Sequence, residues 1–247
     1  MTAQSCQMRI RALVDGGRPI RARVWIAGVA TLLTLAGASR VGAVAHRRVS
    51  AREAAAMAAR IEQRSGFPVL VNEHLLEDLN RKVATPTSRE ALRQTLARMS
   101  EYRPMMERVL EAKGVPRELI AVALHESKFQ REARTSRRGQ KRPLGFWQLM
   151  PSSARKFGLE VSAARDERLD PQRATEAAAG LLADGYARLG DWPLAIAAYK
   201  AGLLRIQAAG SGVSRGKARA RLKPQYSRYL ARVMAWVILI DNPPLLD

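Results

Sequence analysis

The sequence predicts a mainly α-helical protein, and three observations carry this prediction. Helix-starting signals recur along the chain, and apolar residues behind them repeat at spacings of three and four. No alternation of apolar and polar residues extends beyond a few positions, so strands are not expected. Hydrophobic residues make up 47% of the 247 residues and charged residues 26%, which indicates a folded chain with a sizeable core. We expect one or two domains built from successive helices.

Helical runs open the part of the chain that follows residue 48. "SARE" at residues 50–53 is a capping box, in which Ser and the Glu three residues later bond each other's backbone N–H groups. The run that it opens is expected to end near Gly66, because Gly commonly ends a helix. A short helix that begins at Asn72 should follow.

The next helices are expected to be separated by prolines. "TSRE" at residues 87–90 is a second capping box, and its helix should reach Tyr102. Pro104 would then start a new helix that ends at Gly114, because Pro fits the first position of a helix better than its interior. By the same rule, Pro116 should occupy the first position of the helix after that.

Two later helices carry complete start and stop signals. The first has Asp170 as N-cap, Pro171 at its first position and Gly190 past its end. The second repeats this pattern from Asp191 to Gly202. Beyond them, a basic loop over residues 210–224 is expected to precede a last helix through residues 228–240.

The chain is strongly basic. Its formal net charge is +20, from 42 Lys and Arg against 22 Asp and Glu, with Arg-rich loops expected at residues 137–142 and 215–223. Such a surface favours polyanions, which include nucleic acid, anionic lipid and acidic cell-wall polymer. A genome biased toward Ala and Arg would produce the same excess. The charge alone therefore does not choose the partner.

The N-terminal segment, residues 1–48, has the pattern of a signal peptide or a membrane anchor. An Arg-rich start precedes the uncharged run Val24–Ser39, which is shorter than the roughly 20 residues of a spanning helix and slightly long for a signal sequence. "AVA" at residues 43–45 has the small-x-small form of a cleavage site. The alternatives are a cleaved signal, or an uncleaved anchor over residues 24–45; a buried core helix would not need the one-sided Arg flank. Both membrane readings carry residue 49 onward across a membrane, which makes nucleic acid a poor partner.

Cysteine and histidine give no sign of a metal site. Cys6 is the single cysteine, so an intramolecular disulfide is excluded. The three histidines, His46, His74 and His125, lack metal-ligand spacing, and "HESKF" has Phe129 where a zinc peptidase motif needs its second His. We expect neither a metal nor a cofactor.

The stretch "AVALHESKFQ", residues 121–130, places a carboxylate on a helix face that should be apolar. Leu119, Val122, Ala123 and Glu126 follow the spacing i, i+3, i+4, i+7, which is one face of a helix. One reading is a buried Glu paired with a cation, or one at the rim of the apolar stripe. The other is a general acid, because apolar surroundings disfavour an ionised carboxyl group and leave it a proton to donate. Spacing alone leaves both readings open.

Four motifs in order resemble one family. They are Glu-Ser at 126–127, "GFWQLMP" at 145–151, "AYKAG" at 198–202, and Tyr229 in the last helix. This order is similar to that of the lytic transglycosylases with an SLT domain, which have a goose-lysozyme-like fold in the α+β lysozyme superfamily. The membrane-bound D-type branch is the most similar. The resemblance implies a transglycosylase domain over residues 105–241, preceded by a helical support segment over residues 49–104.

The resemblance also implies a reaction. Such enzymes cleave the β-1,4 bond between N-acetylmuramic acid and N-acetylglucosamine of peptidoglycan in the periplasm. At the family's catalytic position, Glu126 would protonate the leaving oxygen, then accept the proton of the C6 hydroxyl that attacks C1 and closes a 1,6-anhydro ring. The implied partners are peptidoglycan glycan strands and, through the N-terminal segment, the inner membrane; no cofactor is needed.

A second carboxylate separates this reaction from hydrolysis. A hydrolase usually needs one to act as nucleophile or to activate water, whereas an intramolecular hydroxyl at high effective concentration does not. The acids downstream are Asp166, Glu167 and Asp170. They sit at a helix start, where capping is their expected role. Hydrolysis stays open at this point.

The family pattern assigns supporting roles to further residues. Gln148 and Met150 would line the saccharide groove. Tyr199 would point its hydroxyl at Glu126, and Tyr229 would help to shape the floor of the cleft. These assignments follow from motif positions alone.

Other matching or departing positions have two readings each. Ser127 would hydrogen-bond near the acid or simply be a small residue on the helix face, and Trp147 is expected to pack in the core. The family has two small residues where residues 140–144 read "QKRPL", so this loop is longer and more basic. The family has Asn where Lys200 stands. An ammonium group there would stabilise ionised Glu126 and weaken it as an acid, or would point outward without effect.

Two alternatives follow from these departures. A non-catalytic peptidoglycan-binding or secretion-scaffold protein would keep the groove but lose turnover through Lys200. A hydrolytic muramidase would release reducing ends instead of anhydro ends.

Overall fold

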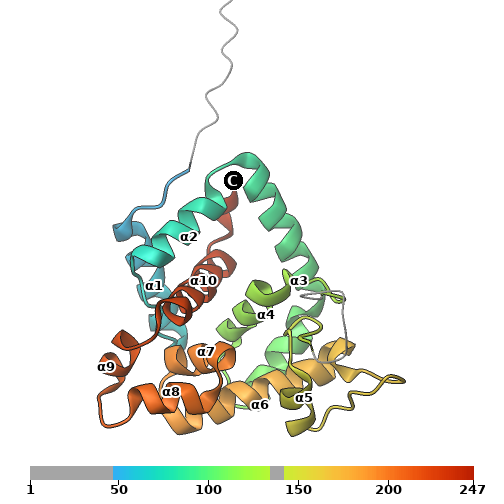
Figure 1. Ribbon diagram of the computed structural model, residues 1–247. Coiled ribbons are helices and arrows are strands. Elements are labelled where there is room, and N and C mark those ends of the chain that lie inside the picture. Colours follow the sequence, from blue (N-terminus) through green and yellow to red (C-terminus); the bar gives the residue numbers. More distant parts are fainter. Residues whose placement is uncertain (1–46, 134–141) are drawn as a thin grey trace, which may run out of the picture. The chain divides into compact units, whose positions relative to one another are not determined.

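Helices dominate the computed structural model, which describes residues 47–133 and 142–247 (Figure 1). Strand-like pairing within these ranges is limited to the isolated bridges Leu144–Leu149 and Val161–Asp166. The mainly α class is therefore confirmed. The predicted leader and most of the loop at 137–142 lie outside the described residues. In the described part, no helix is both long enough and apolar enough to cross a membrane.

The first two helices begin and end as predicted. Helix α1 (Ala51–Ser65) starts at the capping box, where the Ser50 hydroxyl accepts from the Glu53 N–H at 3.2 Å and the Glu53 carboxylate accepts from the Ser50 N–H at 2.8 Å. Gly66 ends it in the left-handed conformation, with φ 70°. Helix α2 (Glu73–Val83) starts at Asn72, whose side chain accepts from a backbone N–H of the first turn.

Helix α3 (Pro86–Ala112) corrects two predictions at once. Its cap is Thr85 with Ser88, two residues before the predicted box, because Pro86 takes the first helical position. The helix then runs through Pro104 without ending. Pro104 is exposed, so water can satisfy the carbonyl that loses its donor, while Met99 and Met106 are buried on either side. The boundary predicted at residue 104 therefore falls inside a continuous helix.

Helix α4 (Ile120–Ser127) is the innermost helix of the described part, packed against α3 and α10. Its first five residues are almost inaccessible to solvent. The predicted start at Pro116 is wrong, because a 3-10 turn, η1 (Arg117–Leu119), intervenes. The helix ends at Lys128, which has φ 51°. Glu126 consequently lies on its last turn.

The remaining helices follow α4 along the chain. They are α5 (Pro151–Lys156), η2 (Glu167–Leu169), α6 (Pro171–Leu189), α7 (Trp192–Ala201), α8 (Leu203–Gly210), α9 (Arg215–Ala220), α10 (Pro224–Asp241) and η3 (Pro243–Leu246). The predicted caps of α6 and α7 are confirmed. The basic loop is corrected, since it contains α9, and the last helix begins at Pro224 rather than residue 228.

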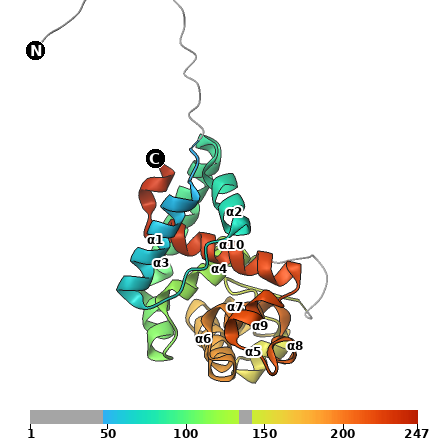
Figure 2. The same ribbon diagram turned by 90° about the vertical axis from the view of Figure 1, so that its left-hand side faces the viewer.

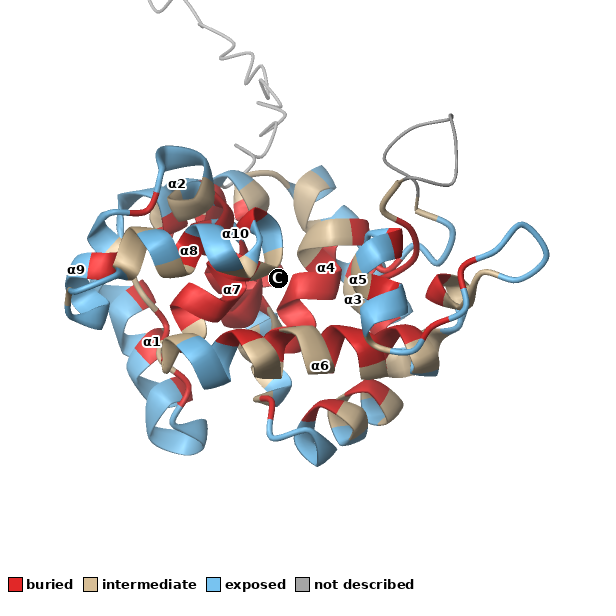
Figure 3. Cartoon of the chain, turned by 60° about the horizontal axis from the view of Figure 1, so that its bottom comes forward, coloured by how far each residue is buried: buried red, intermediate tan, exposed pale blue. Residues whose placement is uncertain are grey.

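Helix α10 contacts helices from both the early and the late part of the described chain. It packs against α2 on one side and against α4 and α7 on another (Figures 1 and 2). Buried residues are concentrated on α4, α7 and the inward faces of α6 and α10, whereas α9 is mostly exposed (Figure 3). The core therefore surrounds the helix that carries Glu126.

Candidate functional site

Glu126 projects from the last turn of α4 and is 12% exposed. Leu119, Val122 and Ala123 of the predicted stripe are buried beneath it. The opposite charge that it meets is the ammonium of Lys200, whose Nζ lies 3.8 Å from Glu126 Oε1. Lys200 comes from the last turn of α7 and is about half exposed. The carboxylate thus faces the residue at which the sequence departs from the family pattern.

Two tyrosines flank this carboxylate. Tyr229 of α10 is buried, and its hydroxyl has no hydrogen-bond partner of ordinary length. Burial raises its pKa well above the usual value, and so do the negative charge of Glu126, the neighbouring Tyr199 and a lengthened contact of its hydroxyl with Glu126. Burial and Glu126 raise the pKa of Tyr199 in the same way. Both phenols therefore keep their protons near neutral pH.

The hydroxyl of Tyr199 differs from its predicted direction. It donates to the backbone carbonyl of Trp147 at 2.6 Å, instead of to Glu126. The carbonyl is presented by a tight turn, because Gln148 that follows has φ 44°. Tyr199 consequently joins α7 to the "GFWQLMP" segment while its ring stays close enough to Glu126 to feel its charge.

The "GFWQLMP" turn is held by close backbone approach. Gly145 has φ 78°, and a Cβ there would lie 2.1 Å from the carbonyl oxygen of Arg168. The Gln148 amide nitrogen donates to the carbonyls of Ala133 at 2.7 Å and Gly145 at 2.8 Å, so this part of its side chain braces the turn. Met150 is 44% exposed at the start of α5 and is free to meet a ligand.

Trp147 and Ser127 have structural contacts. Trp147 is fully buried and its indole N–H donates to the Thr175 hydroxyl at 2.9 Å, as expected of a core residue. The Ser127 hydroxyl donates to the Ala123 carbonyl at 3.0 Å and accepts from the Phe129 N–H at 3.1 Å. It closes the end of α4 and so supports Glu126 through the backbone.

Two residues near the site were missed by the sequence reasoning. The His125 ring packs edge-on against Tyr229, with centroids 5.0 Å apart, and burial lowers its pKa to about 4, with help from Lys82 and Arg232. Arg168 is buried, pairs with Asp166 at 2.7 Å and donates to the Leu149 carbonyl at 3.0 Å. Neither position carries a sequence signal, because a long-range contact creates each role.

The acids that could assist Glu126 are engaged elsewhere. Besides the pairing of Asp166, the Glu167 carboxylate accepts from the Glu160 N–H at 2.8 Å and pairs with Arg165 at 3.0 Å. The Glu160 N–H, Arg173 and Arg165 hold the pKa of Glu167 below its usual range. Asp170 caps α6, as predicted. Across residues 47–133 and 142–247, no three His, Cys, Asp or Glu residues gather in a way that could hold a metal ion.

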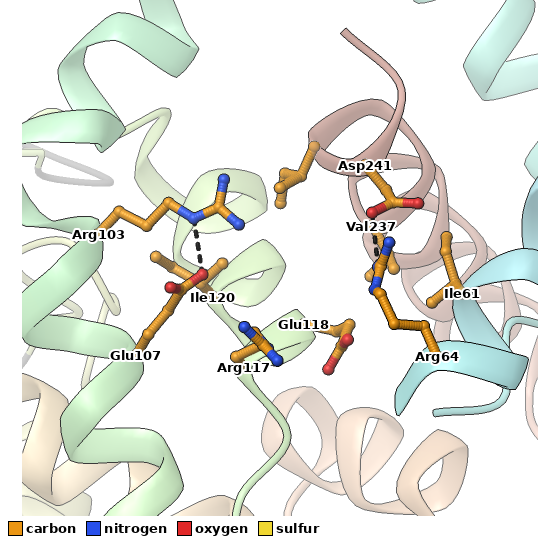
Figure 4. A pocket seen from close by; sticks show the side chains of 10 residues that line it. Ile61, Arg64, Arg103, Glu107, Arg117, Glu118, Ile120, Val237 and Asp241 are labelled. Carbon is orange, nitrogen blue, oxygen red and sulfur yellow. Dashed lines mark hydrogen bonds and ion pairs between the residues drawn. The ribbon is translucent and has the colours of Figure 1, made fainter. Parts of the chain in front are cut away.

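A separate pocket of about 200 Å³ lies where α1, α3, η1 and α10 meet (Figure 4). Ion pairs stand on two of its sides: Arg103 with Glu107 at 2.6 Å, and Arg64 with Asp241 at 2.6 Å. Its charges therefore largely satisfy each other, and Glu126 is not among its lining residues. The residues that line this pocket come from both sides of residue 105 in the sequence.

Comparison with known proteins first defines the class. Residues 105–221 match the family described as Transglycosylase SLT domain. Within that class, 146 residues are 27% identical to membrane-bound lytic murein transglycosylase D of Escherichia coli, both in strain K12 and in strain O6:H1. The aligned part is 54% of this chain but 30% of those proteins, so the chain spans less than a third of their length.

One solved structure shows a weaker likeness. It is an inactive variant of the lytic transglycosylase Slt from Pseudomonas aeruginosa, 23% identical in sequence. The match covers 58% of this chain and 24% of that one, with a TM-score of 0.47.

Proposed function

We propose that this chain is a peptidoglycan lytic transglycosylase, which cleaves the β-1,4 bond between N-acetylmuramic acid and N-acetylglucosamine. The observation that carries the proposal is the position of Glu126. Inside the matched domain, it is a nearly buried carboxyl group at the end of an apolar helix, beside two phenols that keep their protons. Such a group is suited to give and take one proton in a water-poor setting.

The proposed reaction needs this one acid. Protonated Glu126 donates its proton to the glycosidic oxygen as the bond to C1 breaks. The C6 hydroxyl of the same muramic acid attacks C1, and its proton passes to the Glu126 carboxylate, which restores the starting state. No water is consumed, because the attacking hydroxyl belongs to the substrate and is held at high effective concentration.

The surroundings of Glu126 support transglycosylation over hydrolysis. A retaining or inverting hydrolase places a second carboxylate roughly 5 to 10 Å from the acid. Asp166, Glu167 and Asp170 are instead committed to Arg168, to Arg165 with the Glu160 N–H, and to the cap of α6. These three acids therefore have structural roles and do not supply the second carboxylate of a hydrolase.

Incubation of the full chain with purified sacculi tests the proposal. Mass spectrometry of the released fragments should show muropeptides that end in a 1,6-anhydro ring. Fragments with reducing ends would identify a muramidase. Binding without release would identify the scaffold alternative, which the closeness of Lys200 to Glu126 favours.

The matching variant is Glu126→Gln. The amide keeps the shape of the side chain but cannot donate a proton, so turnover should fall by about a hundredfold to ten-thousandfold. Sacculus binding and the unfolding curve should stay close to wild type. Activity within a few-fold of wild type would remove Glu126 from its proposed role.

The cellular setting is part of the proposal. We infer export to the periplasm through residues 1–48, with residues 24–45 as signal or inner-membrane anchor and residues 49–104 as a helical support for the domain. Gln148, Met150, Tyr199 and Tyr229 are proposed to contact the glycan. The relatives in Escherichia coli are named as membrane-bound, which supports a tether in this chain too.

A further inference from the structure

The charge of the chain is unevenly distributed, and its C-terminal part holds an uninterrupted basic stretch. Between Asp191 and Asp241 there is no Asp or Glu. The cations in this stretch are Lys200, Arg205, Arg215, Lys217, Arg219, Arg221, Lys223, Arg228 and Arg232. The stretch begins at the candidate site, because its first cation is Lys200 beside Glu126.

The periodicity of α9 divides its cations into two groups. Arg215 and Arg219 lie on one face, four residues apart. Arg219 pairs with Asp191 at 2.9 Å, and the Arg215 guanidinium lies against Gly190, where an added Cβ would stand 2.5 Å from it. These two cations fasten α9 to the corner between α6 and α7. They have a structural role.

The other group faces solvent. Lys217 and Arg221 share the opposite face of α9, and Lys223 follows immediately at the start of α10. All three are exposed, and none forms an ion pair with any residue in the described ranges. Exposed like charges that repel one another do not stabilise the fold, so folding gives no reason for this cluster.

A bridge of contacts connects these cations to the site. Arg205 of α8 donates to the Ala201 carbonyl at 2.9 Å, next to Lys200, and to the Tyr226 hydroxyl of α10 at 3.2 Å. Helices α7, α8 and α9 contact one another in pairs, and Figure 1 shows them together at one end of α10. Leu204 beside this bridge is 78% exposed.

We propose that Arg205, Lys217, Arg221 and Lys223, here called the basic surface, bind the carboxylate-bearing peptide stems of the glycan strand that occupies the site. The inference rests on the proposed function. Peptidoglycan combines a neutral sugar backbone with acidic peptides. When the glycosidic bond to be cleaved lies at Glu126, the peptide carboxylates of the neighbouring sugars lie on either side of the site. The basic surface follows Lys200 along the chain, is connected to it through the bond of Arg205 to the Ala201 carbonyl, and offers cations without ion pairs, together with exposed Leu204, for such anions.

Charge removal on both partners tests the basic surface. The Glu126→Gln chain serves as the background, so that substrate is not consumed. In it, Lys217, Arg221 and Lys223 are changed together to Gln. Three exposed pairs, each worth a factor of roughly two to five, predict about tenfold to hundredfold weaker binding to intact sacculi. On sacculi whose carboxylates have been converted to amides with a carbodiimide and an amine, this difference should disappear.

The chain offers a matched control. Arg52, Arg108 and Lys113 are equally exposed cations on α1, on α3 and just after α3, and changing them to Gln removes the same charge. Sacculus binding should fall less than twofold. An equal loss in both triple variants would show that net charge, not the basic surface, binds the polymer, and would overturn the inference.

A further arm measures binding to vesicles of phosphatidylglycerol and phosphatidylcholine. If the basic surface governs binding to these vesicles but not to sacculi, it belongs to a lipid contact and the inference fails. Fragment release by the chain with Glu126 intact, measured on unmodified sacculi, reports on the proposed function separately. If the chain with Glu126 intact released no fragments but the triple variant still bound sacculi more weakly, the proposed enzymatic function would be refuted. The inference about the basic surface would stand.

Discussion

At the scale of single residues, Glu126 shows what could be read from sequence and what could not. Its place on the apolar face and its motif make it the candidate acid, and the stripe predicted beneath it is buried in the structure. The 3.8 Å approach of Lys200 depends on how α7 packs against its neighbours, which no local pattern encodes. The direction of the Tyr199 hydroxyl depends likewise on the turn at Gln148.

Replacing Lys200 by Asn should increase activity at neutral pH or leave it unchanged. An ammonium beside Glu126 favours the ionised carboxylate, and its removal favours the form that can donate a proton. Because Lys200 is about half exposed, water screens the effect, and we expect a gain of at most about tenfold. The rates at which the two proteins release fragments from sacculi at neutral pH measure this gain.

Lys200→Arg is the control for this change, because it keeps the positive charge. Its rate of fragment release at neutral pH should equal that of the wild type. A large loss of activity in Lys200→Asn would show that the ammonium is a working part of the site, contrary to the expectation.

His125 should make stability depend on pH. Its pKa is lowered to about 4, chiefly by burial, then by Lys82, Arg232 and Lys200, with Asp78 opposing them. The unfolded chain binds the proton more readily, so stability is full above the unfolded value near 6.5 and is lost as pH falls toward 4. The loss would be about 3 kcal/mol at most.

Urea unfolding of wild type and His125→Gln between pH 7 and pH 4 measures this loss. The wild-type curve should fall more steeply than that of the variant over this range and run parallel to it below pH 4. Parallel curves throughout would mean that His125 takes up its proton equally readily in the folded and the unfolded chain.

At the scale of elements, most caps were predictable, with the box predicted at Thr87 as the exception, and interruptions were not. Ser50, Asn72 and Asp170 act through bonds within one turn, so their sequence neighbourhoods are sufficient. Pro104 fails as a helix start because Met99 and Met106 bind α3 to the core on both sides of it. Tertiary packing there outweighs a cost that a local rule would place at about 3 kcal/mol.

Gly145→Ala should destabilise the protein more than Gly158→Ala. Both glycines have positive φ, 78° and 82°, so both substitutions cost about 1 kcal/mol through the backbone. A Cβ at Gly158 would meet nothing within 4 Å, whereas one at Gly145 would collide with the Arg168 carbonyl. We expect an additional 1 to 3 kcal/mol, about the usual cost of overpacking, from this collision.

Chemical denaturation of the two variants separates the collision from the backbone term. Gly145→Ala should also lower activity, since the turn positions Met150 and the Trp147 carbonyl that holds Tyr199. Equal destabilisation by the two substitutions would show that the turn moves without cost.

At the scale of the whole molecule, the chain from residue 47 onward folds as one unit. The family match begins at residue 105, inside α3, and α10 is covered by α2 from the preceding segment. The sequence predicted that residues 49–104 are helical. It did not predict that α3 continues across residue 104, because this depends on how α3 packs against the core. The match therefore marks where sequence is shared, and the folding unit is larger.

A fragment of residues 105–247 should be much less stable than one of residues 47–247. It lacks Leu75, Leu79 and Val83, all of them fully buried on α2, and it cuts α3 beside Met106. Loss of such contacts exposes apolar surface at about 25 cal/mol per Å². Circular dichroism during heating should show a sharp transition for the longer fragment and a broad or absent one for the shorter. Coincident transitions would show that residues 105–247 fold without residues 47–104.

The buried hydroxyl of Tyr229 has no hydrogen-bond partner of ordinary length, and this lowers the stability of the fold. A buried donor with no acceptor at all costs about 1 to 3 kcal/mol, and a contact with Glu126 beyond ordinary length leaves part of that cost in place. A phenylalanine ring would fill the same space without it. The side chain that would make this fold most stable is therefore not the one present, which is the pattern expected where stability is exchanged for chemistry. A ligand oxygen that accepts a hydrogen bond from Tyr229 would recover this free energy, so ligand binding should raise the free energy of unfolding by more than its other contacts supply.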